Sequence, residues 1–391
     1  MKEAVIVSAT RTPVGKFGGS LKDLSATKLG AIAVKESVRR AGIEAKEIEE
    51  CIMGNVIASG LGQNPARQAA LHGGLTDEVS ALTINKVCGS GLKAVMLAAD
   101  AILAGKERAI VAGGMESMTN APYLLEKARF GYKLFDSSLV DAMVRDGLWE
   151  AFNNYHMGNT GEIVAERNGI TREDADKFSL WSHQKAVQAM KSGAFKDEIV
   201  PIELVSKKDK VIISLDEGPR EDSSLEALAK LKPAFKDNGI LTAGNSSSIN
   251  DGAAAVVVMD SDLAKQKGMK PLVRIVDYLT TGVKPELLME APIHAVRKLL
   301  NRNHLTIKDI DLFEHNEAFS TASVATMRVL GVPEGKFNVN GGAVALGHPI
   351  GCSGARVLTT LIYAMRARDA KKGIATLCLG GGNAVAMLVE K

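Results

Sequence analysis

Apolar residues recur along this chain in two alternating patterns, which predict helices and strands in turn. Leu92, Val95 and Met96 lie at helical spacing, and the apolar run AIVAGG follows them. Leu358 and Leu361 begin a second helical pattern, which ends at the strand-like run GIATLCLGGG. A further strand, within KEAVIVSA, is predicted almost at the first residue. Strands that alternate with helices in this way are typical of an α/β fold.

The same patterns reveal an internal repeat. The segment AVKESVRRAGIEAKEIEECIMGN begins at Ala33 and aligns without gaps on AVRKLLNRNHLTIKDIDLFEHNE, which begins at Ala295, an offset of 295 − 33 = 262 residues. Each copy predicts a helix, a polar turn and a short apolar strand. Further on, CGSG from Cys88 aligns with GCSG from Gly351, each at the start of a predicted helix. The chain is therefore predicted to consist of two similar halves.

A long insertion interrupts the first half. The final strand NAVAMLVE has its counterpart in GAAAVVVMD, so more than a hundred residues between Gly114 and Gly252 lie outside the repeat. The insertion holds most of the Trp and Tyr residues and predicts a helix from Thr171 to Met190, opened by the N-terminal sequence TRED. Its polar run KKDK, from Lys207, is interpreted as a solvated turn. Insertions of this length usually build a binding surface or an oligomer contact.

The composition and charge of the chain argue against several classes of protein. The 391 residues exceed the size at which a single core keeps growing, and 46% apolar with 24% charged residues is ordinary for a globular protein. A net charge of +3 is too small to indicate nucleic-acid binding, and no apolar run reaches membrane-spanning length. The four cysteines show no CxxC spacing, which favours reduced thiols in a cytoplasmic protein without a secretion signal.

Four residues are candidates for chemistry. Cys88 lies between the apolar run ALTINKV, a predicted strand, and the first turn of a helix, where free N–H groups favour a thiolate. His348 lies in a glycine-rich loop before Pro349, and Cys378 ends a buried strand. Each also has an ordinary structural interpretation: a small buried side chain for either cysteine, and a turn cap for the histidine. Asn316, at another strand end, is either a turn residue or an amide that holds a water or an oxyanion.

Taken together, the motifs VCGSG, GGMESM, NEAF, GGAVALGHPIG and CLGGG occur in this order over the whole chain, which resembles the thiolase family from end to end. YHMGNTGE and TAGNSSSINDGAA resemble its biosynthetic acetoacetyl-CoA branch. The resemblance implies a duplicated five-layered αβαβα fold with an inserted loop domain. Its implied units are residues 1–117 with 250–270 as the N-terminal half, 118–249 as the loop domain for CoA binding and oligomer contacts, and 271–391 as the C-terminal half.

The resemblance also implies a reaction, the Claisen condensation of two acetyl-CoA molecules to acetoacetyl-CoA and CoA. Cys88 would carry the acetyl group, His348 would remove the proton of its thiol, and Cys378 would abstract the α-proton of the second acetyl-CoA. Asn316 would hold a water that forms one oxyanion hole with His348. The backbone N–H groups of Cys88 and Gly380 would form the other. A nucleophile, a base at a weakly acidic carbon and two oxyanion holes are what this chemistry requires.

For CoA binding, the resemblance points to Arg220 at the phosphates, for which a surface ion pair with Glu217 or Glu221 is the alternative. Neither a cofactor nor a metal is expected. The expected partners are acetyl-CoA, acetoacetyl-CoA, CoA and further copies of the chain. The segment Ala121–Asp146 resembles the loop that joins dimers into tetramers, so a homotetramer is expected, in the cytoplasm and in fatty acid metabolism. The other CoA-binding residues implied are Ala243, Ser247, Leu148, His156, Met157, Ala318 and Phe319.

Some positions depart from the family pattern, and other functions stay open. Asn383 and Ala384 replace a common Gln-Gly pair, and Cys352, Ser320 and Ala227 also differ from many relatives. A degradative 3-ketoacyl-CoA thiolase of broader chain length would use the same residues. A ketosynthase would replace the second cysteine by His or Asn. A non-catalytic acyl-CoA or lipid carrier would tolerate the loss of a reacting residue.

Overall fold

The computed structural model describes residues 2–205 and 210–391 and is built on one ten-stranded sheet. The strand order is β14-β15-β16-β13-β1-β12-β5-β3-β4, with β2 paired to β12. The two halves of the sheet meet where β1 pairs antiparallel with β13. The strands are β1 (Ala4–Arg11), β2 (Gly15–Lys16), β3 (Glu50–Gly54), β4 (Ser80–Ile84), β5 (Ala109–Ser117), β12 (Asn250–Asp260), β13 (Val273–Gly282), β14 (Leu312–His315), β15 (Lys372–Leu379) and β16 (Asn383–Glu390).

The sequence repeat is present in space. In the first copy, α1 (Ala26–Ala41) leads through the 3₁₀ turn η1 (Ala45–Glu47) to β3. In the second, α8 (Ala291–Arg302) leads through η5 (Ile307–Asp309) to β14. Both turns begin with a capping box, in which a side chain and a backbone N–H satisfy each other reciprocally. The predicted order of helix, polar turn and strand is confirmed in both halves.

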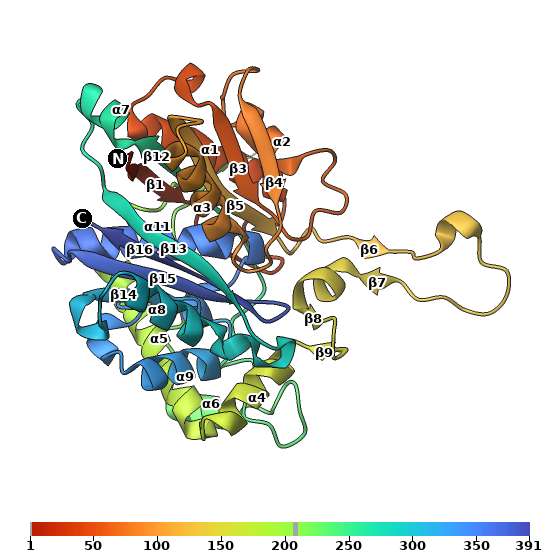
Figure 1. Ribbon diagram of the computed structural model, residues 1–391. Helices are drawn as coiled ribbons and strands as arrows, with labels where there is room; N and C mark the ends of the chain where they lie inside the picture. The colour runs from red at the N-terminus through yellow and green to blue at the C-terminus, as the bar shows by residue number, and fades with distance from the viewer. Residues whose placement is uncertain (1, 206–209) are drawn as a thin grey trace.

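The elements form five layers. The helices α3 (Ser90–Leu103) and α11 (Ile350–Ala367) pack on each other between the two halves of the sheet. Outside them, α1 and α2 (Pro65–His72) cover the N-terminal half, and α8 and α9 (Ser320–Leu330) cover the C-terminal half (Figure 1). This confirms the αβαβα arrangement. The central helices approach closely because glycines face each other, and a Cβ at Gly354 would lie 2.3 Å from the Leu92 nitrogen.

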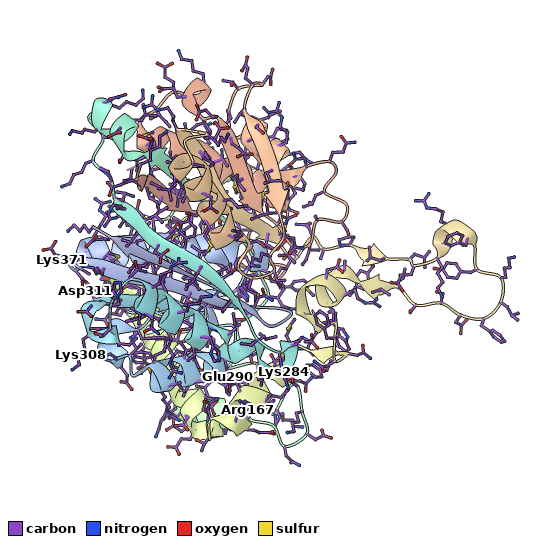
Figure 2. All side chains as sticks on the ribbon, viewed as in Figure 1. Arg167, Lys284, Glu290, Lys308, Asp311 and Lys371 are labelled. Atoms are coloured by element: carbon purple, nitrogen blue, oxygen red, sulfur yellow. The ribbon has the colours of Figure 1, made fainter. Side chains whose placement is uncertain are left out.

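The insertion follows β5 in the chain but packs largely on the C-terminal half. Its helices α4 (Gly158–Arg167) and α5 (Arg172–Ser192) lie against α9, and α4 also contacts the turn η4 (Pro285–Glu290) (Figure 1). Arg167 of α4 and Glu290 of η4 form an ion pair of 3.0 Å at this contact, and both are labelled in Figure 2. The predicted start of α5 is confirmed, with Thr171 and Asp174 in a capping box.

Before α4, the insertion extends as a narrow arm away from the layers (Figure 1). The polar run from Lys207 lies outside the described residues up to Asp209. Within the described part of the chain, no helix has both the length and the apolar character of a membrane span. The remaining elements are β6 (Tyr123–Leu124), η2 (Ala128–Phe130), β7 (Val140–Asp141), the π-helix η3 (Met143–Leu148), β8 (Trp149–Glu150), β9 (Tyr155–His156), β10 (Ile202–Val205), β11 (Lys210–Ile213), α6 (Leu225–Ala229), α7 (Ser261–Gln266), η6 (Glu334–Lys336) and α10 (Ala343–Leu346).

Candidate active site

Cys88 lies in a tight turn just before α3. The predicted strand through ALTINKV is shorter than expected, because β4 ends at Ile84 and Val87 has a left-handed φ of 48°. The hydroxyl of Ser90 closes the turn: it donates to the Val87 carbonyl at 2.6 Å and accepts from the Lys86 N–H at 2.8 Å. This geometry presents the Cys88 sulfur to an internal cavity.

The protonation state of Cys88 differs from the sequence prediction. Burial raises the pKa of the thiol to about 12, although the backbone N–H groups of Cys88 and Gly380 act in the opposite direction. The expected preference for a thiolate at this helix start is therefore wrong, because desolvation outweighs the N–H groups.

His348 is held on three sides. Its backbone N–H donates to the Asn250 side-chain oxygen at 2.9 Å, and its Nδ1 lies 2.5 Å from the hydroxyl of Ser353. That hydroxyl donates to the Pro349 carbonyl, so we assign the ring proton to Nδ1 and a free lone pair to Nε2. The Asn316 amide lies 3.4 Å from Nε2. Burial, and secondarily the charge of Arg356, lowers the pKa of His348 to about 3, which keeps the imidazole neutral and able to accept a proton.

Asn316 directly follows β14, and Cys378 lies in the neighbouring parallel strand β15. The Asn316 N–H donates to the Thr376 carbonyl at 3.1 Å, and its side-chain oxygen is buried without a protein partner among the described residues. Such an atom is suited to hold a water. The thiol of Cys378 donates to the Met289 sulfur at 3.6 Å, and burial followed by the proximity of Cys88 raises its pKa well above the ordinary range.

One cavity of about 200 Å³ brings Cys88, His348, Cys378 and Gly380 together. Six of the residues expected at CoA also line it, namely Leu148, His156, Met157, Ser247, Ala318 and Phe319. Sequence reasoning missed several wall residues, including Phe235, Leu288 and Met289. Phe235 stacks on the His156 ring with centroids 4.8 Å apart. No local motif marks these residues, apart from Met118 at the end of GGMESM. The wall also includes Val87, Met118, Gly147, Ser248, Ile249 and Ile350.

Two predicted CoA residues lie away from this cavity. Ala243 is exposed in a turn that the Asn245 side chain closes by accepting the Thr242 N–H at 2.7 Å. The Arg220 guanidinium lies at a separate surface hollow and pairs with Asp222 at 3.0 Å. The alternative partners considered for Arg220, Glu217 and Glu221, are therefore wrong, because Glu217 accepts from the Lys16 and Ser20 N–H groups and Glu221 pairs with Lys191.

Metal ligation has no support in the described residues. Nowhere in residues 2–205 and 210–391 do three or more His, Cys, Asp or Glu side chains come together in a group that fits a metal ion. The polar groups at the cavity are two thiols, the imidazoles of His156 and His348, and backbone or hydroxyl groups. This set combines a nucleophile, a neutral base and a second acid–base group around a small apolar space, which is an arrangement for acyl-transfer chemistry.

The fold and this cysteine–histidine–cysteine site define a thiolase. The chain matches the family model described as "Thiolase, N-terminal domain" over residues 4–262 and "Thiolase, C-terminal domain" over residues 269–391. The protein belongs to the thiolase family, whose members named below are acyltransferases.

The similar proteins named below are acetyl-CoA acetyltransferases or a probable acetyl-CoA acyltransferase. The chain is 53% identical to an acetyl-CoA acetyltransferase of Escherichia coli strain K12 and 51% identical to one of Cupriavidus necator, each over the full length of both chains. A probable acetyl-CoA acyltransferase of Staphylococcus epidermidis is 48% identical over 100% of this chain and 99% of its own. The crystal structure of the Bacillus anthracis acetyl-CoA acetyltransferase superposes with a TM-score of 0.98 at 42% identity, over 100% of this chain and 99% of that one.

Proposed function

We propose that this thiolase catalyses the reversible condensation of two acetyl-CoA molecules to acetoacetyl-CoA and free CoA, through an acetyl group carried on Cys88. The observation that carries the proposal is the meeting of Cys88, His348 and Cys378 at one small cavity. The full-length similarity to proteins named acetyl-CoA acetyltransferase supports the choice of acyl group.

In the first half-reaction, His348 takes the proton of the Cys88 thiol as the sulfur attacks the acetyl-CoA carbonyl. The free lone pair on Nε2 and the neutral ring suit this role. A thiol with a pKa near 12 needs such a base, since little thiolate is present at neutral pH. The negative oxygen of the tetrahedral intermediate is stabilised by the N–H groups of Cys88 and Gly380. CoA then leaves as a free thiol with the proton of Cys378, so Cys378 becomes a thiolate and His348 stays protonated at Nε2.

In the second half-reaction, Cys378 removes the α-proton of a second acetyl-CoA. The resulting enolate oxygen accepts hydrogen bonds from His348 and from a water held by Asn316. The enolate carbon attacks the acetyl group on Cys88, and collapse of that intermediate releases acetoacetyl-CoA and the Cys88 thiolate, which takes its proton back from His348. Because one oxyanion develops at the enolate and another at the tetrahedral centre on Cys88, two sets of donors are needed, and the loss of one donor raises the barrier by roughly 3 kcal/mol. None of these steps calls for a metal or a redox cofactor.

CoA is proposed to extend from the cavity toward the insertion. Its pantetheine arm would pass along Ser247 and Ala243. Arg220 then lies at the phosphate end. At the thioester end, Leu148, His156, Met157, Ala318 and Phe319 form the apolar wall. With Phe235 stacked on His156, this wall bounds a cavity of about 200 Å³, which we propose suits short acyl groups. A short-chain preference follows.

The protein is proposed to act as a cytoplasmic homotetramer, a dimer of dimers, in fatty acid metabolism. The arm between Ala121 and Asp146 carries large apolar side chains in the open, with Phe130 84% and Phe135 89% exposed. Apolar patches of this kind are usually covered by a partner, and a second copy is the partner proposed here. Light scattering on the purified protein tests the assembly, and a monomer at micromolar concentration would contradict it.

Thiolysis assays test the reaction. The protein is expected to convert acetoacetyl-CoA and CoA to acetyl-CoA, and to turn over a medium-chain 3-ketoacyl-CoA with kcat/KM at least about ten-fold lower, because each methylene that the wall excludes is worth roughly 1–3 kcal/mol. Faster turnover of the longer substrate would identify a degradative enzyme instead. No turnover of either substrate would favour a non-catalytic acyl-CoA binding protein.

A further inference from the structure

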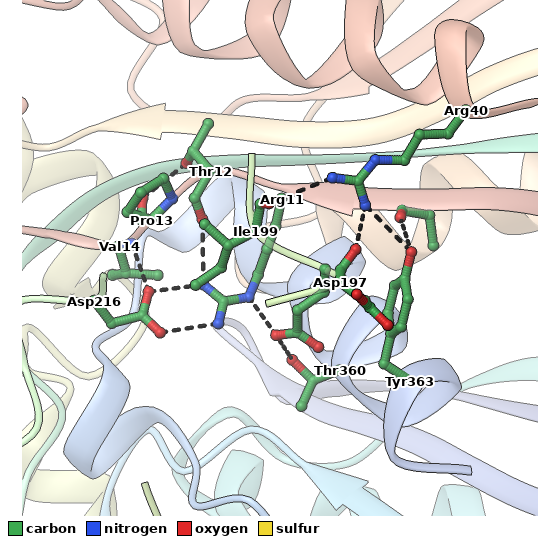
Figure 3. A network of polar contacts seen from close by, with 12 residues as sticks. Arg11, Thr12, Pro13, Val14, Arg40, Asp197, Ile199, Asp216, Thr360 and Tyr363 are labelled. Carbon is green, nitrogen blue, oxygen red and sulfur yellow. Dashed lines mark hydrogen bonds and ion pairs between the residues drawn. The ribbon is translucent and has the colours of Figure 1, made fainter. Parts of the chain in front are cut away.

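The segment that carries Arg220 is fixed at its start by buried contacts. The carboxylate of Asp216 accepts two N–H groups of Arg11, at 2.7 and 2.9 Å, and the Val14 N–H at 2.8 Å (Figure 3). The next residue, Glu217, accepts the Lys16 N–H at 2.7 Å, and its own N–H donates to the Val14 carbonyl at 3.1 Å. These hydrogen bonds fix the backbone at Asp216 and Glu217, and therefore the direction in which the chain continues toward Arg220.

The segment then passes against the loop that precedes His348. A Cβ at Gly218 would lie 2.2 Å from the Ala345 carbonyl oxygen, so only glycine permits this approach. Ala345 belongs to α10, which ends two residues before His348. The path to Arg220 is thus tied both to β1 and to the active-site loop.

His183 of α5 supplies the last anchor. Its side chain is 6% exposed, and its Nδ1 accepts the backbone N–H of Arg220 at 3.1 Å. Since Nδ1 accepts, the neutral ring carries its proton on Nε2. Burial first, and the nearby Arg220 guanidinium second, lowers the pKa of His183 to about 4, while Asp222 raises it and Lys16 lowers it further. The ring is therefore a neutral acceptor at physiological pH.

Beyond this anchor, the Arg220 guanidinium lies over a hollow of about 330 Å³ on the surface of α5. Gln184, Gln188 and Lys191 of α5 line the hollow, and so does Glu221, which pairs with Lys191. Among the described residues, the guanidinium forms an ion pair with Asp222 alone, and both side chains are more than 60% exposed. An exposed pair of this kind contributes little to stability, so a phosphate group displaces Asp222 at little cost.

We infer that His183 is a positioning residue for CoA: by holding the backbone at Arg220, it places the guanidinium over this hollow, which receives the phosphates at the nucleotide end of the substrate. The inference rests on the proposed function, because it assumes a CoA thioester in the cavity. It adds a residue that does not itself touch the substrate, and it predicts an effect on binding of the phosphorylated part alone.

Steady-state thiolysis of two substrate pairs tests this role: acetoacetyl-CoA with CoA, and acetoacetyl-S-pantetheine with pantetheine, which lack the nucleotide phosphates. His183→Leu removes the acceptor and is expected to raise the KM for the CoA pair about ten-fold, the size of one charge-assisted hydrogen bond. The kcat is expected to stay within about two-fold, and the KM for the pantetheine pair to stay unchanged. His183→Asn, whose side-chain oxygen replaces Nδ1, is expected to restore the KM.

A double variant tests whether His183 affects the KM for CoA through Arg220 or by disturbing the structure elsewhere. If His183 acts through Arg220, His183→Leu combined with Arg220→Met raises the KM for CoA no further than Arg220→Met alone. Should His183→Leu not fold, His183→Phe keeps the ring volume without the acceptor and carries the same prediction. Equal KM increases for both substrate pairs, additive effects in the double variant, or an unchanged KM for CoA would each overturn the inference. Failure of the unaltered protein to turn over either pair would instead overturn the proposed function.

Discussion

The two halves of the molecule share a scaffold but differ in what occupies equivalent positions. In the repeat, Met53 of β3 is equivalent to His315 of β14. Met53 pairs with Gly113 of β5, and His315 pairs with Thr376 of β15. Gly113 is therefore equivalent to Thr376, and Met115 to Cys378. In the N-terminal half, Met115 fills the space against α1, where a Cβ at Gly30 would lie 2.4 Å from its sulfur. In the C-terminal half, the smaller Cys378 borders the active-site cavity. The same strand end is therefore core in one half and site in the other.

At the starts of the central helices, the N-terminal half supplies the residue of the site and the C-terminal half supplies the residue of the core. Cys88 precedes α3 and borders the cavity, whereas its counterpart Gly351 begins α11 in close contact with β5. A Cβ at Gly351 would lie 2.8 Å from the Met115 carbonyl oxygen. One half thus supplies the first sulfur, and the other supplies His348 and the second sulfur. A duplicated fold becomes an asymmetric site when each copy keeps reactive groups at different equivalent positions.

The largest expected effect concerns the two cysteines nearest the central helix starts. Cys88→Ala is expected to abolish acetylation of the protein by acetyl-CoA and to lower thiolysis by a factor on the order of 10⁴ or more, because the nucleophile is lost. Cys352→Ala is the matched control: that thiol is buried beside Ala254 and Ala355, and activity should remain. Intact-protein mass spectrometry measures the acetyl group. Equal labelling of the Cys88→Ala protein would remove Cys88 from the mechanism.

The next effect tests the pair Met115 and Cys378. Cys378→Ala is expected to leave acetylation of Cys88 intact and to lower condensation about 10²- to 10⁴-fold, the range that one general base contributes. Met115→Leu, at the equivalent position, should leave kcat unchanged and alter the free energy of unfolding by less than about 1.5 kcal/mol. Rapid-quench measurement of each half-reaction separates the steps. Loss of acetylation in the Cys378→Ala protein would contradict the division of roles.

A smaller effect is expected from the hydroxyl that orients His348. Ser353→Ala removes the acceptor at Nδ1, so the neutral ring is free to place its proton on Nε2, and kcat should fall about 10- to 100-fold. Ser320→Ala removes another buried hydroxyl, which has no hydrogen-bond partner among the described residues, and should leave kcat unchanged. Steady-state assays with thermal unfolding of both variants distinguish orientation from lost stability. Equal kcat values for the two variants would argue against the assigned tautomer.

The smallest effect concerns stability rather than chemistry. Glu314 occupies the position of the apolar Ile52 in the repeat, and burial raises the pKa of its carboxyl from 4.5 to about 8, with Arg356 acting in the opposite direction. A raised folded-state pKa contributes stability below pH 4.5 that is lost as the pH rises through 8. Glu314→Gln should therefore raise Tm by a few degrees at pH 9 and hardly at pH 5. Calorimetry at both values measures this, and an equal shift at both would contradict a pH-dependent origin.

Much of the scaffold was predictable because it rests on local patterns. The helical spacing around Leu92, the repeat from Ala33 and the TRED start of α5 each depend on residues close in sequence, and the structure confirms all three. The predictions that failed concern residues whose conformation or protonation depends on contacts beyond the local pattern. The strand before Cys88 ends early because Ser90 closes a turn, and desolvation raises the pKa of the Cys88 thiol, which favours its protonated form.

The sequence alone determined the α/β class, the duplication, the insertion and the reactive residue types, since periodicity and motif order are properties of the chain itself. Only the tertiary structure decided which atoms meet. Met289 reaches Cys378 from a turn 89 residues away in sequence, and the His183 ring meets Arg220 across 37 residues. Contacts of this kind depend on how whole layers pack, and packing is set by the sum of all side-chain volumes rather than by any local pattern.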